Sequence, residues 1–375
     1  MNFQPAIRFW ALLWAAVFLF TFSVGGQASP TPPKSNPPAK VKKKSINASR
    51  PATAKKKQIV KTRKKTKSAK TAKGKNARRV VKKPKAESVI PLVATVRPAA
   101  NGDSPIHETV EQEIQYLKNN QRLQPGDDIS VQIFDLVENK MLVDINGDKV
   151  RNAASLIKPY VMLAVYEQIS RQELNETPDI SRQVHRMITV SDNQATNTLI
   201  RHLGQGDNQQ GIVVVNALVR KYGFQQTAVR ELIPDGGKTY ANRTSAADAT
   251  LFFKLLYEQK LVNPHYSQKM TDILLKNVHD RIETHQIKQD GVAVADKTGY
   301  VRGLNADCGI VYQKNQQGKG HDYVLSIFIE NKNRPADGSW GRRKSAVIRY
   351  LSDRIYHNLK TCTAKVFNLS LKDNS

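Results

Sequence analysis

A long run of positively charged residues divides this chain into two parts of very different composition. Between residues 29 and 100 there are 23 Lys and Arg residues against a single acid, Glu87. This stretch is rich in Lys, Pro, Ala, Ser and Thr and has few large apolar side chains, so it cannot bury enough surface to offset the entropy lost on ordering. The sequence therefore predicts a disordered basic linker over residues 29–100 and confines the folded domain to residues 101–375.

The linker carries +22 of the formal net charge of +27, and with Arg8 set aside about +4 remains for the folded domain. A cationic segment of this kind binds polyanions weakly and in a strongly salt-dependent way, through the release of counterions. It contains no Phe, Trp or Tyr that would stack on bases, so specific nucleic-acid recognition is not expected. The linker either contacts anionic envelope polymers or a membrane surface, or it is a spacer, and the sequence leaves both open.

The N-terminus has the pattern of an export signal. Arg8 precedes an apolar run over residues 9–24, and the small residues Gly26 and Ala28 suit cleavage after Ala28. This run is shorter than the ~20 residues that a membrane-spanning helix needs. We therefore expect residues 1–28 to be a signal peptide, with an uncleaved membrane anchor as the alternative. In either case the folded domain is expected in the periplasm or at the cell envelope.

Two cysteines, Cys308 and Cys362, are present in the chain. An oxidising compartment permits a disulfide between them, while the apolar run around Cys308 equally suits a buried free thiol. Both alternatives stay open. The eight histidines are scattered and form no His-Glu-x-x-His or paired-cysteine pattern, so we expect neither a metal ion nor another cofactor.

Hydrophobic periodicity predicts an α/β (α+β) fold for the domain. Helices are expected near residues 110–117, in several segments between residues 179 and 277, and at residues 344–359. The predicted strands lie at residues 129–136, 141–145, 292–294, 309–312 and 323–329. The first two strands are joined by a polar turn and predict a hairpin. Because strands occur near both ends of the domain, we expect one sheet assembled from those ends, flanked by a helical subdomain.

Apolar side chains nearly encircle the helix predicted at residues 155–169, which indicates that this helix is buried. It begins with Ser155-Leu156-Ile157-Lys158, where a hydroxyl and an amine three residues apart share one helix face. A deprotonated Lys158 at that place would take the proton of Ser155, while the helix N-terminus stabilises the negative charge that develops during attack. A Ser-x-x-Lys match alone is weak evidence, because a buried helix can contain both residues by chance.

Two further tripeptides carry side chains suited to acyl transfer. Ser191-Asp192-Asn193 lies between two helical segments, where Ser or Asp can act as a helix cap. In the functional interpretation Ser191 moves a proton toward the leaving nitrogen, and Asn193 binds the substrate amide and Lys158. Lys297-Thr298-Gly299 ends a strand-like run, where Gly299 would allow a substrate backbone to approach closely. A plain surface strand that ends in a turn is the alternative there.

In this order the three motifs resemble those of the class A β-lactamases and penicillin-binding proteins. The resemblance covers about residues 105–360. It implies a β-lactamase/transpeptidase-like fold, in which an antiparallel sheet flanked by helices adjoins an all-helical subdomain and the active site lies between them. It also implies an oxyanion hole from the backbone N–H groups of Ser155 and Tyr300. Lys297 and Thr298 would hold the substrate carboxylate, and Arg302 either adds charge to that subsite or is a solvated loop arginine.

The chain departs from the class A pattern at the deacylation base. Class A enzymes carry a loop with Glu, any two residues, Leu and Asn, in which the Glu activates the deacylating water. The nearest match is Glu231-Leu232-Ile233-Pro234-Asp235, which has Asp where Asn is expected. Glu231 is the candidate base, and a surface carboxylate paired with Arg230 or Lys238 is the alternative. The interval from Ser155 to Ser191 is also shorter than in typical class A enzymes, which predicts a more open cleft.

These observations predict an exported serine hydrolase that acts through a Ser155 acyl-enzyme on β-lactam amides. A D-alanyl-D-alanine peptidase, or another hydrolase of peptidoglycan stem peptides, is the first alternative, because an open cleft suits a peptide chain. A penicillin-recognising sensor or cell-wall attachment protein without turnover is the second. The expected partner is a small-molecule β-lactam or a stem peptide, and the protein is expected to be a monomer.

Overall fold

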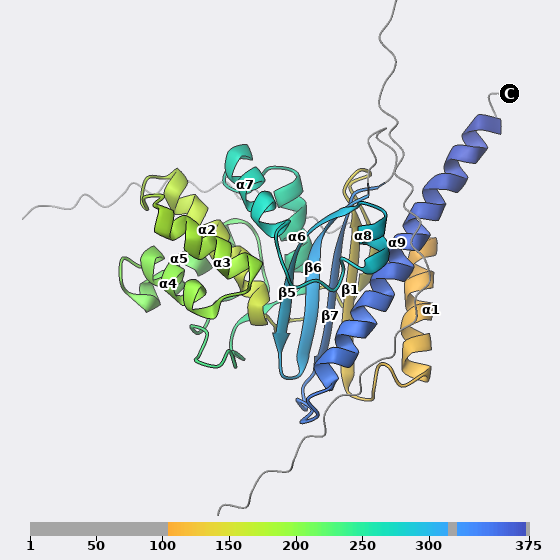
Figure 1. Ribbon diagram of the computed structural model, residues 1–375, viewed down its shortest axis with the longest axis horizontal. Helices are drawn as coiled ribbons and strands as arrows, with labels where there is room; N and C mark the ends of the chain where they lie inside the picture. The colour runs from red at the N-terminus through yellow and green to blue at the C-terminus, as the bar shows by residue number, and fades with distance from the viewer. Residues whose placement is uncertain (1–103, 314–320, 373–375) are drawn as a thin grey trace, which may run out of the picture. The chain divides into compact units, whose positions relative to one another are not determined.

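The computed structural model describes residues 104–313 and 321–372 (Figure 1). The predicted signal peptide and the basic linker lie outside the described residues. The helices are α1 Pro105–Asn119, the 3-10 turn η1 Ala154–Ile157, α2 Lys158–Ser170, α3 Pro178–Thr189, α4 Asn193–Leu203, α5 Asn208–Lys221, α6 Ala246–Tyr257, α7 Pro264–Leu274, α8 His285–Gln289 and α9 Trp340–Lys372. The strands are β1 Asp127–Asp135, β2 Lys140–Ile145, β3 Arg151–Asn152, β4 Arg243–Thr244, β5 Ala293–Val301, β6 Leu304–Tyr312 and β7 Tyr323–Asn331.

Local sequence signals explain where most of these helices begin. Pro occupies one of the first two positions of α1, α2, α3 and α7, where its missing N–H costs no hydrogen bond. A side-chain oxygen accepts a hydrogen bond from a first-turn N–H at six helix starts. The capping residues are Thr177, Asp192, Asp207, Ser245, Asn263 and Thr284.

Five strands form one antiparallel sheet in the order β2-β1-β7-β6-β5. Strand β1 lies between β2 and β7, so the sheet joins the beginning and the end of the domain, as the sequence predicts. The side chains of β6 and β7 are buried almost throughout, which means that both faces of the sheet are covered. Strand β5, which carries Lys297-Thr298-Gly299, forms one edge of the sheet.

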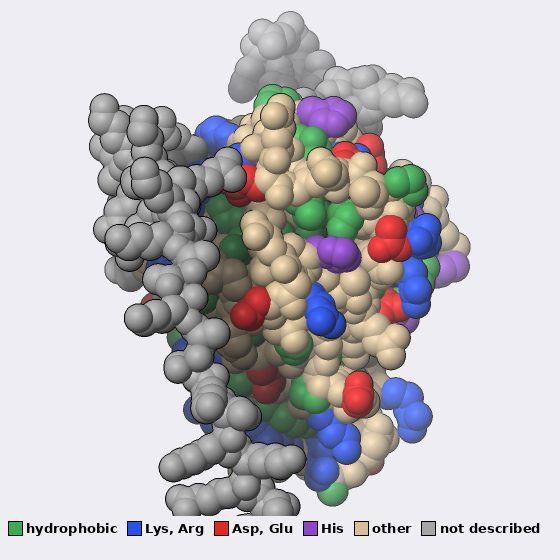
Figure 2. Space-filling view, turned by 90° about the vertical axis from the view of Figure 1, so that its left-hand side faces the viewer, with side chains coloured by type: hydrophobic (Ala, Val, Ile, Leu, Met, Phe, Trp, Pro, Cys, Tyr) green, Lys and Arg blue, Asp and Glu red, His purple; other side chains and the backbone are tan. Residues whose placement is uncertain are grey.

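Two hydrophobic cores lie on opposite faces of the sheet. Helices α1 and α9 cover one face, and α6 lies on the other face beside the subdomain formed by α2–α5 and α7 (Figure 1). The larger core includes almost the whole of α2, from Tyr160 to Ile169, which confirms that this helix is buried. Figure 2 views the subdomain side, where acidic and basic side chains are mixed over most of the surface and Lys and Arg gather at the lower edge.

The expected fold class is confirmed by an antiparallel sheet with helices on both faces. Several boundaries differ from those expected. The hairpin is present, but β5 runs through Val301, so Lys297-Thr298-Gly299 lies within a strand and not in a turn after one. The last helix begins at Trp340 and ends at Lys372, longer than expected at both ends. Ser155 lies in η1, a tighter turn that precedes the α-helix predicted to begin there.

Two further expectations, a disulfide between Cys308 and Cys362 and a membrane anchor at the N-terminus, involve residues or side chains outside the described part of the chain. Cys308 is a buried free thiol in β6, whereas the side chain of Cys362 lies outside the described part of the chain. In the described ranges, no helix combines the length and the apolar character that a membrane crossing requires.

Candidate active site

Ser155 lies in the tight turn η1, between β3 and the buried helix α2. The residue before it, Ala154, has a φ of 43°, a left-handed conformation that costs a non-glycine residue about 1–2 kcal/mol. Two hydrogen bonds hold this turn: Ala154 N–H donates to Asn152 Oδ1 at 2.8 Å, and Ala153 N–H donates to the Asn242 carbonyl at 2.9 Å. Ser155 is partly exposed, and its hydroxyl makes no hydrogen bond to any of the described residues. The turn therefore presents a free hydroxyl.

Lys158 is the first residue of α2 and is completely buried. Its Nζ lies within hydrogen-bond distance of three oxygens: the Ser191 carbonyl at 2.6 Å, Ser191 Oγ at 2.9 Å and Asn193 Oδ1 at 2.9 Å. None of these groups is a carboxylate. Burial lowers the pKa of Lys158 to about 6, helped by the nearby positive charge of Lys297 and opposed by Asp192. At neutral pH Lys158 is thus mainly an uncharged amine with a lone pair.

Three adjacent residues at the start of α4, Ser191, Asp192 and Asn193, have two roles: they cap the helix and they contact Lys158. Asp192 caps α4 by accepting from Ala195 N–H at 2.9 Å and also pairs with Arg186. Ser191 has a φ of 56°, and this left-handed conformation accompanies the bonds from both its carbonyl and its hydroxyl to Lys158. Asn193 reaches the same amine. Capping and contact with Lys158 are therefore both present and do not exclude one another.

Lys297-Thr298-Gly299 lies directly against η1, the turn that holds Ser155. A Cβ atom added at Gly299 would come within 3.0 Å of Leu156 Cγ and 3.3 Å of the Ala153 carbonyl oxygen. Any larger residue at this position would push these neighbours away by a few tenths of an ångström. The next residue, Tyr300, is half exposed, with its ring packed against Gly341 at the start of α9.

Lys297 is buried beside two carboxyl groups. Its Nζ donates to the Thr298 carbonyl at 3.0 Å, and its pKa is lowered by burial against the opposing effect of Asp296 and Asp307. Burial, together with the nearby charge of Asp307, raises the pKa of Asp296. Two backbone N–H groups, those of Arg281 and Ile282, donate to Asp307 Oδ2. A proton held by Asp296 thus lets both acids stay buried next to Lys297.

The Glu231 carboxylate is bound by its own loop. Its Oε1 accepts from Thr239 Oγ1 at 2.7 Å, Tyr240 N–H at 2.7 Å and Ala241 N–H at 2.9 Å. Desolvation raises the pKa of Glu231, but these hydrogen bonds outweigh it and lower the pKa overall. Within the described ranges Glu231 forms no ion pair with Arg230 or Lys238, and its partners come from residues 239–241 of its own loop.

One asparagine that the sequence did not indicate connects Glu231 to the turn that holds Ser155. Asn242 Oδ1 accepts from the N–H groups of Arg230 and Glu231 at 2.7 and 3.1 Å, and the Asn242 carbonyl accepts from Ala153 N–H. At the tip of the loop, a Cβ added at Gly237 would lie 2.9 Å from Asn193 Nδ2. No sequence pattern marks Asn242, because its role depends on the position of a turn about 90 residues earlier.

The structure brings most of the predicted site residues together. Lys158, Ser191 and Asn193 are joined by direct hydrogen bonds, and Gly299 packs against the turn that holds Ser155. Glu231 is linked to this cluster through Asn242, with no hydrogen bond to Ser155 or Lys158 among the described residues. Arg302 is exposed and donates to the carbonyls of Arg334 and Pro335. The sequence patterns did not indicate Asp296 either, although its position directly before Lys297 was a usable signal.

Comparisons with known proteins identify a matching family and similar solved structures. The model of a family described as the β-lactamase enzyme family matches residues 109–183 and 175–359. A comparison with curated proteins found no match. Among solved structures, a variant of PBP-A in its acyl-enzyme complex with penicillin G is 23% identical with a TM-score of 0.55, covering 68% of this chain and 97% of that one.

Two solved β-lactamases show a similar likeness. The enzyme from Sphaerobacter thermophilus is 20% identical with a TM-score of 0.52, and the match covers 67% of this chain and 97% of the other. A class A representative from Bacteroides cellulosilyticus is 19% identical with a TM-score of 0.53, covering 68% and 98%. At these identities the likeness shows a shared fold.

Proposed function

Since the chain belongs to the β-lactamase enzyme family, we propose that it is a serine hydrolase whose Ser155 forms an acyl-enzyme with β-lactam amides. The observation that carries this proposal is the buried Lys158 amine. It lies one helical turn from an unbonded serine hydroxyl and has a pKa of about 6, so it is able to accept a proton at neutral pH.

Acylation then follows from the neighbours of Lys158. The amine takes the Ser155 proton as Oγ attacks the carbonyl carbon of the lactam. The tetrahedral intermediate collapses with cleavage of the C–N bond, and Ser191 gives its hydroxyl proton to the leaving nitrogen. Lys158 returns the first proton to Ser191 across the 2.9 Å hydrogen bond, which restores the neutral amine.

The edge strand β5 supplies the groups that position the substrate. We assign the oxyanion to the backbone N–H groups of Ser155 and Tyr300, and the loss of one such donor typically costs ~10²–10³ in rate. Lys297 and Thr298 bind the substrate carboxylate, and the close packing at Gly299 brings these residues next to the nucleophile turn. Asn193 binds the substrate amide.

Deacylation requires a base for the incoming water, and we assign it to Glu231. One oxygen of this carboxylate is occupied by three donors from its own loop, and the lowered pKa keeps the group ionised at neutral pH. Asn242 bonds to the backbone of Glu231 and to the backbone of the turn that holds Ser155. One residue therefore positions both the group proposed for acylation and the group proposed for deacylation.

Stopped-flow kinetics with a chromogenic cephalosporin tests the proposal. We expect a burst followed by many turnovers in the wild-type protein, and neither phase in Ser155→Ala. Covalent labelling by a fluorescent penicillin should likewise vanish in Ser155→Ala. Labelling that survives this substitution would show that Ser155 is not the nucleophile.

A D-alanyl peptidase is the second candidate. Two observations favour it: one structurally similar protein is a penicillin-binding protein acylated by penicillin G, and the Glu231 carboxylate bonds to its own loop and not to Lys158. A single stoichiometric burst with the cephalosporin, together with hydrolysis of a D-alanyl-D-alanine peptide, would select this candidate. A burst without hydrolysis of either substrate would indicate a sensor or attachment protein.

For the location of the protein we propose export to the periplasm or cell envelope, on the basis of the N-terminal sequence. Fractionation of cells with an antibody against residues 101–375 tests this, and recovery in the cytoplasm would contradict it.

A further inference from the structure

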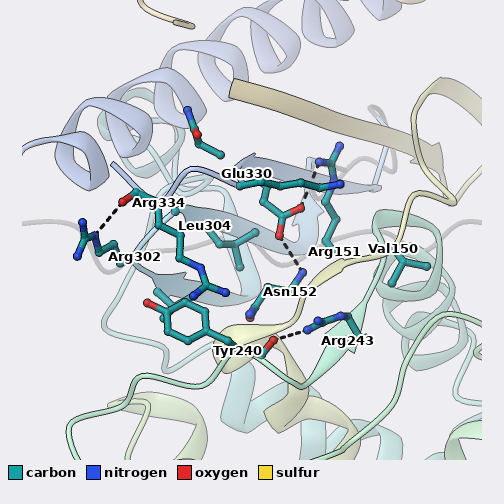
Figure 3. Close-up of a pocket in the computed structure, with 13 residues that line it drawn as sticks. Val150, Arg151, Asn152, Tyr240, Arg243, Arg302, Leu304, Glu330 and Arg334 are labelled. Atoms are coloured by element: carbon teal, nitrogen blue, oxygen red, sulfur yellow. Dashed lines mark hydrogen bonds and ion pairs between the residues drawn. The ribbon is translucent and has the colours of Figure 1, made fainter. Parts of the chain in front are cut away.

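A pocket of about 310 Å³ adjoins the proposed active site and takes no part in the mechanism described above (Figure 3). Four segments form its walls: the β3–β4 pair, Tyr240 from the Glu231 loop, the turn between β5 and β6, and the segment from the end of β7 to Arg334. Two of its lining residues are close in sequence to residues of the proposed site. Asn152 precedes Ser155 by three residues, and Val301 directly follows Tyr300.

The pocket carries an excess of positive charge. Five basic residues and one acid, Glu330, line it. Arg151 is buried and compensated, since it pairs with Asp128 at 3.0 Å and with Glu330 at 3.6 Å. The other four form no ion pair with any carboxylate in the described part of the chain. They are Arg243, Arg302, Lys332 and Arg334. Figure 3 shows Arg243, Arg302 and Arg334 around the pocket.

Two of these cations are held in place before any ligand arrives. The Arg334 guanidinium lies 3.8 Å from the centre of the Tyr240 ring, and Figure 3 shows it lying beside that ring. Arg334 has a φ of 46°, and its N–H donates to the Asn331 carbonyl at 2.9 Å. Arg243 donates to the carbonyls of Tyr240 and Asn242. An arginine ordered in this way loses little side-chain entropy on binding an anion.

The order of residues along β5 shows which part of a substrate reaches this pocket. The proposed function places the substrate carboxylate at Lys297 and Thr298 and the scissile carbonyl at Tyr300. A substrate that runs along this edge strand therefore directs its acyl portion past Tyr300 toward Val301 and Arg302. Two residues of a strand span roughly 7 Å, which is within reach of a short side chain on the acyl group.

We propose that this pocket binds a carboxylate on the acyl portion of the substrate, so that the protein selects acyl donors with a second negative charge in addition to the carboxylate held by Lys297. The inference rests on the proposed function, because Ser155 acylation fixes the direction of the substrate. The chemistry is that of a stem peptide with acidic side chains, or of a β-lactam with an anionic acyl group. Guanidinium groups suit such a ligand, because they bind carboxylates through two parallel hydrogen bonds.

Two penicillins that differ by one carboxylate test the proposal: benzylpenicillin and its α-carboxyl derivative, carbenicillin. The measurement is the second-order rate constant of acylation for each, and the result is the ratio of carbenicillin to benzylpenicillin. We expect Arg334→Gln and Lys332→Gln each to lower this ratio, Arg334→Gln by about tenfold, since a charge-assisted hydrogen bond is lost. Arg182→Gln, an exposed arginine of α3, should leave the ratio unchanged.

The wild-type protein gives a second test that needs no variant. Raising the salt concentration should lower the ratio, because screening weakens attraction to the extra carboxylate of carbenicillin. The proposal would be overturned if the ratio in Arg334→Gln stayed within twofold of the wild-type ratio. It would also be overturned if the wild-type ratio did not change with salt concentration. If neither penicillin acylates the protein, the proposed function itself fails, and the inference fails with it.

Discussion

Lys158 is a cation in water and mainly an amine in this protein. The protein surrounds its nitrogen with a carbonyl, a hydroxyl and an amide oxygen, and with no carboxylate in direct contact. Burial without a counter-ion disfavours the charged form, which is the physical reason for the pKa of about 6. The same amine in an exposed helix would stay protonated to about pH 10 and would be useless as a base near neutrality.

The rate of Ser155 acylation should therefore depend on pH through Lys158. Below about pH 6 the amine becomes protonated, so the acylation rate should fall roughly tenfold per pH unit and reach a plateau above about pH 7. Fluorescent-penicillin labelling between pH 4.5 and 8 measures this profile. Lys158→Arg, a cation at every pH in that range, should be nearly inactive throughout. A wild-type profile that is flat across pH 6 would exclude Lys158 as the base.

Glu231→Gln should separate acylation from deacylation. The Gln side chain keeps an oxygen to accept from Thr239, Tyr240 and Ala241, so the loop should stay in place while the base is lost. We expect the acyl-enzyme to accumulate, visible by mass spectrometry of the intact protein, with the burst rate unchanged. Thr239→Val removes one donor to the carboxylate and one acceptor of Asn242 Nδ2 but keeps the base, so this control should not trap the acyl-enzyme. Turnover at the wild-type rate in Glu231→Gln would remove this residue from the mechanism.

The sequence predicted those parts of the site that depend on local spacing. Ser155 and Lys158 are three residues apart, and Ser191 and Asn193 are two apart, so short motifs indicated them once the three motifs were taken together in order. The roles of Asn242 and of the pocket cations were not predictable, because they depend on how separate loops meet. Neither Arg334 nor Tyr240 has a neighbour in the sequence that signals their contact.

At the scale of secondary-structure elements, Asp127 at the start of β1 connects β1 to β7 and to α9. Its Oδ1 accepts from Asn331 at the end of β7 at 2.9 Å and from the Trp340 indole of α9 at 3.0 Å. Its Oδ2 pairs with Lys344, and both of these side chains are completely buried. Burial raises the pKa of Asp127, but the hydrogen bonds, of which that from Lys344 contributes most, lower it overall.

Asp127→Asn should destabilise the domain by roughly 3–5 kcal/mol, since it leaves the Lys344 charge buried without a counter-ion. Urea denaturation at pH 7 measures the free energy of unfolding. Arg182→Gln breaks an exposed pair with Asp179 and should cost about 0–1 kcal/mol, which makes it the control. A loss for Asp127→Asn no larger than that of the control would contradict this role of the buried pair.

The pH dependence of the same pair follows from the lowered pKa of Asp127. Its stabilising contribution is complete above the ordinary carboxyl pKa of 3.8 and is lost as the pH falls through the lower folded value. The difference in stability between the wild type and Asp127→Asn should therefore be constant above about pH 5 and shrink in stronger acid.

The sequence predicted the existence and type of most elements but placed several ends wrongly. Strand β5 looked short because Asp296, Lys297 and Gly299 belong to residue types that are depleted in strands. In the structure β5 pairs with β6 along its whole length, and this pairing extends it to Val301. Long-range partners decide such boundaries, and a single sequence does not reveal them.

At the scale of the whole molecule, the basic segment and the folded domain should be separable. We expect deletion of residues 29–100 to leave the rate of acylation unchanged, because every proposed catalytic residue lies after residue 150. Retention on envelope fractions should weaken and lose its salt dependence in the deleted chain, since +22 of the net charge is removed. Equal retention with and without the segment would leave only its interpretation as a spacer.

The pairing of β1 with β7 sets the order in which the domain is able to fold. Asp127 lies opposite Asn331, 204 residues later, so the centre of the sheet forms only when most of the chain has left the ribosome. Contacts over such a separation slow folding, because a large loop must close first. The strand order therefore postpones folding until translation is nearly complete. An exported chain, as we propose this one to be, needs that delay if it crosses the membrane before it folds.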